Sequence, residues 1–106
     1  MIVRTEIWTI PFTADEGDNV LINFNFNAQP LGSGDRLYIE IRESDAAISQ
    51  EFSIDITAAT DRVPVLIQTV KENLTAGTHT YQLYIKTDNT SSEWRFLRGN
   101  ALVMKI

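Results

Sequence analysis

The stretch that decides the fold runs from Asn73 to Ile106 and reads NLTAGTHTYQLYIKTDNTSSEWRFLRGNALVMKI. It divides into a turn, a strand, a polar turn, a second strand, a glycine break and a last strand. Tyr81, Leu83 and Ile85 alternate with polar or amphipathic residues, and such alternation places one face of a strand in a core and the other in water. The stretch therefore predicts β-structure, and it contains no group of residues suited to catalysis.

The rest of the chain repeats this pattern. The clearest alternation is in residues 20–27, where Ile22, Phe24 and Phe26 are separated by asparagines. Asparagine is a poor strand former, so burial of the aromatic face is expected to hold this strand in place. Turn-forming residues recur at intervals of roughly 8–12 residues, which is typical of a β-sandwich or barrel. Strands are predicted over residues 2–10, 20–27, 36–43, 48–56, 63–70, 81–86, 94–97 and 102–106.

Three local features refine this prediction. Pro11 is expected to end the first strand, because proline cannot donate a ladder hydrogen bond. Residues 71–74 are expected to form at most one helical turn, and Gly99 with Asn100 is expected to separate the last two strands. The predicted fold class is all-β, an antiparallel β-sandwich of the immunoglobulin-like or jelly-roll-like kind with about eight short strands. Residues 1–106 are predicted to form a single domain, since their number is close to the commonest domain size.

Composition narrows the possible partners. The chain has no cysteine, which excludes disulfides and thiolate metal sites. Its net charge is −5, and the basic residues are scattered apart from Arg95 and Arg98. We therefore expect no binding to nucleic acid or to anionic membranes. No apolar run approaches the ~20 residues of a membrane span. No export signal is recognisable, so the expected location is the cytoplasm or a particle assembled there.

Candidate sites for chemistry are weak. His79 is the only histidine, and it lacks the orienting carboxylate and nucleophile that acyl transfer needs. Asp15, Glu16 and Asp18 surround Gly17, but their spacing does not match a helix–loop–helix calcium site, so a solvated acidic turn is the expected state. We therefore predict no enzyme activity, no metal and no cofactor.

The aromatic residues are the better candidates for binding. Tyr38 and Tyr84 are expected on the outward faces of their strands, where they could line a docking surface or stack on a sugar. Trp94 shares the parity of Phe96 and is expected in the core, whereas the sequence gives no placement for Trp8. The predicted interface residues are Tyr38, Tyr84, Arg95 and Arg98.

Two features of the chain resemble the N-terminal β-sandwich domain of phage upper-baseplate and tail structural proteins. One is Glu16-Gly17-Asp18 leading into the alternating strand from Val20 to Asn27. The other is the run from Leu74 to Ile85, LTAGTHTYQLYI, followed by residues 94–97 and then Gly99 before a final strand. The resemblance spans most of the chain and lies in turn-and-strand patterns.

The resemblance implies a non-enzymatic structural or assembly module of a virion, which docks onto other virion proteins as part of a homo-oligomer. It brings no catalytic residues to this chain. In that family the domain leads into a helical or fibrous region, whereas this sequence stops after its last strand. The alternative is a carbohydrate-binding sandwich that uses Tyr38, Tyr84 or a tryptophan as a stacking platform for a glycan.

Overall fold

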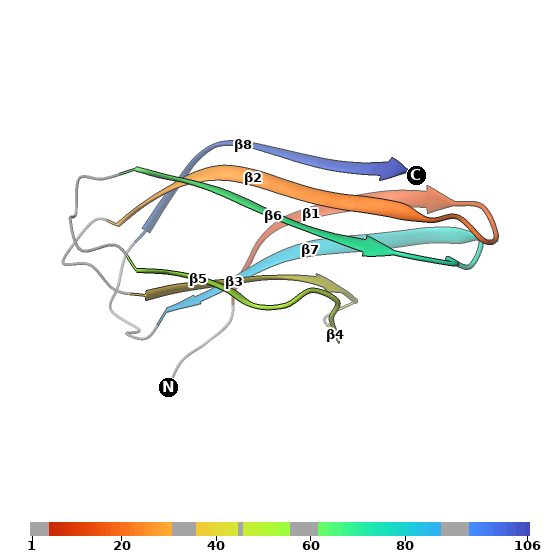
Figure 1. The fold of residues 1–106 in the computed structure, drawn as a ribbon, viewed down its shortest axis with the longest axis horizontal. Helices are drawn as coiled ribbons and strands as arrows, with labels where there is room; N and C mark the ends of the chain where they lie inside the picture. Colours follow the sequence, from red (N-terminus) through yellow and green to blue (C-terminus); the bar gives the residue numbers. More distant parts are fainter. Residues whose placement is uncertain (1–4, 31–35, 45, 56–61, 88–93) are drawn as a thin grey trace.

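The chain forms two antiparallel sheets in a computed structural model that describes residues 5–30, 36–44, 46–55, 62–87 and 94–106 (Figure 1). A five-stranded sheet has the order β1-β7-β3-β4, with β5 also paired to β3, and a three-stranded sheet has the order β6-β2-β8. This confirms the predicted all-β sandwich. The strands are β1 (Thr5–Ala14), β2 (Val20–Pro30), β3 (Arg36–Glu43), β4 (Ala46–Ala47), β5 (Phe52–Asp55), β6 (Val63–Lys71), β7 (Gly77–Thr87) and β8 (Trp94–Lys105).

Successive strands lie in different sheets, except for β3, β4 and β5. The two layers are therefore held together by the chain path as well as by packing. In Figure 1, β8 lies along the upper edge of the view, and β3 and β5 lie along the lower edge. The molecule is elongated along its strands, with extents of 47 × 27 × 17 Å.

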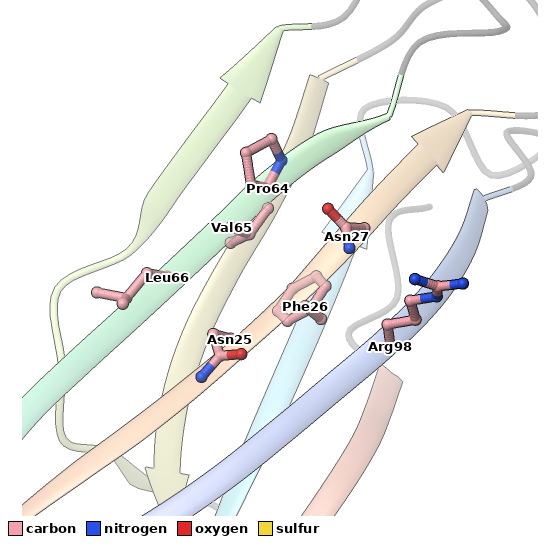
Figure 2. Close-up of a pocket in the computed structure, with 7 residues that line it drawn as sticks. All are labelled: Asn25, Phe26, Asn27, Pro64, Val65, Leu66 and Arg98. Carbon is pink, nitrogen blue, oxygen red and sulfur yellow. The ribbon is translucent and has the colours of Figure 1, made fainter.

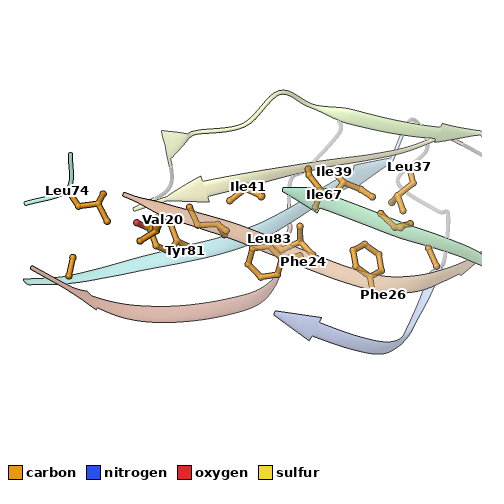
Figure 3. Packing of buried hydrophobic residues seen from close by; sticks show 14 residues of the cluster. Val20, Phe24, Phe26, Leu37, Ile39, Ile41, Ile67, Leu74, Tyr81 and Leu83 are labelled. Carbon is orange, nitrogen blue, oxygen red and sulfur yellow. The ribbon is translucent and has the colours of Figure 1, made fainter. Parts of the chain in front are cut away.

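The core lies between the sheets and follows the predicted alternation (Figure 3). Ile22, Phe24 and Phe26 of β2 point inward, opposite the inward faces of β3 and β7. Burial of such side chains contributes about 1.5–3 kcal/mol each relative to exposure, which offsets the poor strand propensity of the intervening asparagines. The fully buried large side chains are Val20, Ile22, Phe24, Leu37, Ile39, Ile41, Tyr81 and Leu83.

The predicted helical turn at residues 71–74 is wrong. Lys71 is the last residue of β6, and Asn73 has a φ of +58°, which reverses the chain toward β7. This turn is joined to the β1–β2 turn by hydrogen bonds. Leu74 N–H donates to Asp18 O at 2.9 Å, and Gly17 N–H donates to Leu74 O at 2.7 Å. Tertiary bonds between two turns thus determine a conformation that local propensity did not.

Two predicted strand boundaries are also wrong. Pro11 does not end β1, which continues to Ala14. β1 lies at the edge of its sheet, where a missing donor is tolerated. Gly99 and Asn100 do not separate two strands either. They lie within β8, where the pairing with β2 shifts between Asn25 and Asn27 and forms a β-bulge.

The predicted strand over residues 48–56 is shorter in the structure. β4 and β5 are separate, and Ile48 between them packs against the core. Ile54 also packs against the core, but Phe52 is 45% exposed at the groove between β5 and β6. Ile56 lies outside the described residues.

Candidate functional site on the outer face of the three-stranded sheet

The outer face of the three-stranded sheet owes its composition to the alternation of apolar and polar residues along β2. Its even-numbered apolar residues point into the core, so its asparagines point to solvent, and the registers with β6 and β8 place further side chains beside them. The face consists of Leu21, Asn23, Asn25, Asn27 and Gln29 of β2, Pro64, Leu66, Gln68 and Val70 of β6, and Arg95, Leu97, Asn100, Leu102 and Met104 of β8.

Large apolar side chains are concentrated on this face. The exposed fractions are 57% for Leu66, 45% for Val70, 46% for Leu102 and 45% for Met104, and Ile106 follows directly after β8. Single exposed apolar residues are ordinary, but a group of them on one sheet face is typical of an interaction surface.

Sequence reasoning predicted a strand over residues 102–106 but did not predict this face. In β8 the inward residues are the smaller Ala101 and Val103, and Leu102 and Met104 point outward. A signal was available in β6. Residues 63–70 are apolar at positions of both parities, so one set of these residues had to be exposed on a two-layer sandwich.

A chain of side-chain amides crosses the middle of the face. Asn25 Nδ2 donates to Asn23 Oδ1 at 3.3 Å, and Asn23 Nδ2 donates to Gln68 Oε1 at 3.1 Å. These amides are neutral and bond to one another. The centre of the face is therefore polar without being charged, and an apolar partner can approach it without having to bury an ionised group.

A shallow depression of about 260 Å³ lies where β8 bulges (Figure 2). Asn25 and Asn27 lie at its floor, between Leu66 of β6 and Arg98 of β8. Arg98 has a φ of +49°, a conformation that costs a non-glycine residue about 1 kcal/mol. The bulge therefore turns an exposed guanidinium toward the asparagine row.

The bulge is fixed from the inner side by Trp8. A Cβ atom placed on Gly99 would lie 2.4 Å from Cζ3 of Trp8, so only glycine allows the indole to approach this closely. The indole also packs edge-on against Phe24, with ring centroids 5.6 Å apart. Trp8, for which the sequence gave no placement, thus closes the core beneath β8. Trp94 packs against the core as expected.

The charge of this sheet differs from that of the chain. The strands β2, β6 and β8 contain Lys71, Arg95, Arg98 and Lys105 and no acidic residue. Lys105 pairs with Asp15 and Asp18, at 3.2 Å in each case. Arg95 and Arg98 are exposed and have no ion-pair partner within the described residues. Their positive charge is therefore available to a partner.

Tyr38 and Tyr84 lie on the opposite side of the molecule, on the outer face of the five-stranded sheet. Both are half-buried, and each has a cation over its ring. Lys86 Nζ lies 4.9 Å from the Tyr38 centroid, and Arg42 Cζ lies 4.6 Å from the Tyr84 centroid. Arg95 and Arg98 lie on β8 of the three-stranded sheet, so the structure places the two tyrosines on a separate surface from the two arginines.

Glu40 stabilises the tyrosine surface. It lies between the inward residues Ile39 and Ile41 of β3, on the outward side of the strand, but it is only 5% exposed. Arg42 Nε donates to Glu40 Oε1 at 2.6 Å, so the two charges pair along one strand rather than across strands. Lys86 pairs with Glu51 at 3.4 Å. The charges of this face are therefore already compensated within the chain.

The expectation that His79 lacks an orienting carboxylate is wrong, because Glu43 provides one, and the ring is held between two acceptors. Its Nδ1 lies 2.9 Å from Glu43 Oε2 and its Nε2 lies 2.8 Å from Thr75 O. These contacts raise the pKa of His79, with the Glu43 hydrogen bond as the largest cause. Because both nitrogens face acceptors, the imidazolium form satisfies both contacts, and it has no lone pair with which to accept a proton.

The acidic turn at residues 15–18 uses its carboxylates locally. Asp18 Oδ2 accepts from the Asp15 N–H at 2.8 Å, and Glu16 Oε2 accepts from the Ala76 N–H at 2.9 Å. The backbone hydrogen bond lowers the pKa of Asp18. Across the described ranges, no group of three or more acidic, histidine or cysteine side chains is arranged to hold a metal ion. Those ranges also contain no helix long and apolar enough to cross a membrane.

No protein-family model matches the chain, and neither a curated protein nor a solved structure matches it. The resemblance to phage baseplate domains therefore remains a resemblance of sequence pattern.

Proposed function

We propose that this chain is a non-enzymatic assembly module of a virion, of the baseplate or tail type, and that it docks onto other virion proteins through the outer face of its three-stranded sheet. The observation that supports this proposal is the group of exposed apolar residues on that face, at Leu66, Val70, Leu102 and Met104. Arg95 and Arg98 at the rim would steer an acidic partner and fix its orientation. The phage setting comes from the sequence resemblance.

The contrast between the two outer faces also supports docking. On the five-stranded sheet, Arg42 and Lys86 are paired with carboxylates and lie over tyrosine rings. A sugar that stacked on those ring faces would have to displace the cations. The glycan-binding alternative therefore has less support than docking. We expect the wild type to give only a background signal on a broad glycan array, and Tyr84→Ala to give the same signal.

The test is incorporation into particles. The chain would be produced with an epitope tag in the system that encodes it, and particles would be purified on a density gradient. We expect the tagged chain in the particle fraction, and we expect Leu66→Asp to remove it while circular dichroism shows an unchanged fold. Thr13→Asp, at an exposed residue of β1 in the other sheet, is the control. Absence of the wild-type chain from particles would refute the proposed function.

A further inference from the structure

The outer face of the three-stranded sheet changes character along its strands. The end that holds Val70, Leu21 and Met104 is apolar, and it adjoins the acidic β1–β2 turn. The middle holds the asparagines of β2, between Leu66 of β6 and Leu102 of β8. The far end holds Arg95 and Arg98. When a second copy packs on this face with antiparallel strands, each end of the face meets the opposite end of the other copy.

We propose that a second copy of the chain occupies this face. The two copies pack face to face with antiparallel strands, about a two-fold axis that lies between them and runs along the row of Asn23. The inference rests on the proposed docking role of this face and names its partner. Sandwich sheets ordinarily pack in this way, with strand directions within about 30° of each other. A two-fold interface needs a self-complementary surface.

The strand registers supply that complementarity. Gln68, Asn23 and Leu102 form one row across the sheet. A two-fold axis along this row places Leu102 of one copy against Leu102 of the other. It also places Leu66 of each copy against Val70 of the other. The amides of Asn23 and Gln68 also meet their own copies. Apolar groups thus face apolar groups along β6 and at Leu102, and neutral amides face neutral amides in the Asn23 row. At the neighbouring positions of β2 and β8, Leu21 and Met104 face the amides of Asn25 and Asn100.

The same axis brings opposite charges together. Arg95 lies three rows from the axis, so it reaches beyond the end of the partner's β8 to the partner's β1–β2 turn. That turn holds Asp15, Glu16 and Asp18 against the single cation Lys105, which leaves an excess of negative charge. The side chain of Asp15 is 85% exposed and is available for such a contact.

Other self-pairings are less favourable. A two-fold axis that runs along β8 would place Arg95 and Arg98 against their own copies. An antiparallel pairing of two β8 edges centred on Asn100 would bring Arg95 opposite the partner's Lys105. Like charges directly opposite one another destabilise a sheet contact. The arrangement centred on Asn23 avoids both of these clashes.

The experiment compares matched variants of the purified chain by light scattering and analytical ultracentrifugation over a concentration series. We expect a monomer–dimer equilibrium for the wild type. Arg95→Glu should weaken it by about tenfold or more, whereas Arg36→Glu should not. Both are exposed arginines at or near a strand start, and both reversals change the net charge equally. Leu102→Ser should also weaken the dimer, and Phe52→Ser, with nearly the same exposure, should not.

A charge exchange identifies the contact itself. Asp15→Arg and Arg95→Glu should each weaken the dimer when alone, so that each is monomeric at a concentration where the wild type is dimeric. A one-to-one mixture should restore a dimer, because the mixed pair contains one native and one reversed contact, and both are complementary. The inference is refuted if the wild type is monomeric at every accessible concentration, if the Arg36→Glu and Arg95→Glu variants behave alike, or if the mixture stays monomeric.

Failure of this inference can be distinguished from failure of the proposed function. A monomeric chain that still enters particles in a manner that depends on Leu66 would refute the second copy and keep the docking role. A dimeric chain that is absent from particles would keep the second copy and refute the proposed role in the virion.

Discussion

The two outer faces of the sandwich differ in how their polar and charged side chains are paired. On the five-stranded sheet, long polar side chains cover the strands and compensate one another, as Arg42 does with Glu40 and Tyr84. On the three-stranded sheet, neutral amides and exposed leucines lie side by side, and the arginines have no ion-pair partner among the described residues. A face whose charges are already paired within the chain gains little free energy from a partner. A face with unpaired charges and exposed apolar side chains can gain free energy by association.

The largest effect should come from the inner side of the three-stranded sheet, where packing is tight even though the outer face is open. Gly99→Ala places a Cβ against Trp8 and should lower the free energy of unfolding by about 2–3 kcal/mol. Urea denaturation measures this. The control is Gly17→Ala, which has a φ of +85° and no atom within 4 Å, and which should cost only about 1 kcal/mol of backbone strain.

A double variant tests the cause of that effect. Trp8→Phe removes the ring atoms that the new Cβ would strike, so it should cost less stability in the Gly99→Ala background than in the wild type. Strictly additive costs would show that the clash with Trp8 is not the cause.

The next effect should come from the compensated face. Glu40→Ala leaves the Arg42 guanidinium half-buried without its carboxylate, and should lower the free energy of unfolding by about 1–2 kcal/mol. The same denaturation experiment on Arg42→Ala and on the double variant gives the coupling energy. A coupling energy near zero would mean that the pair does not stabilise this face.

A smaller effect should depend on pH. The folded-state pKa of His79 is raised, so its contribution to stability is fully present below the unfolded pKa, near 6.5. It should be lost as the pH rises through the folded-state pKa. We expect the stability difference between wild type and His79→Gln to shrink over that range, from a value below about 1 kcal/mol. A difference that grows as the pH rises would contradict this assignment.

The smallest effect on folding should come from the open face itself. Leu66→Ser removes a side chain that is 57% exposed, so the stability of the monomer should change by less than about 0.5 kcal/mol. Denaturation at a concentration low enough to populate only monomer measures this. A large loss would show that Leu66 belongs to the core of a single chain, and the contrast between the two faces would then disappear.

The amount that the sequence could predict follows from what controls each feature. The all-β class and the inward residues of β2, β3 and β7 follow from period-two alternation, which depends on the strand itself. The turn at Asn73 and the bulge at Gly99 depend on bonds and contacts from distant residues, Asp18 and Trp8, so local reasoning failed there. The candidate face was missed because it depends on which residues of β8 point inward, and the β2–β8 register sets that.

Arg95 and Arg98 were predicted as interface residues from their closeness in the sequence, and both lie on β8. The sequence could not show that Tyr38 and Tyr84 belong to the other side, because the assignment of strands to sheets depends on connections that alternate between the two layers.

The hydrogen bonds between the two turns at one end of the sandwich also define how that end opens. The amides of Gly17, Leu74 and Ala76 donate to the opposite turn, and Ile106 N–H donates to Asn19 O. The backbone bonds of the Gly17 and Leu74 amides can break only when the two turns separate. These two protons should therefore exchange in deuterated water at one common rate, as a single cooperative unit that joins the β1–β2 turn to the turn before β7.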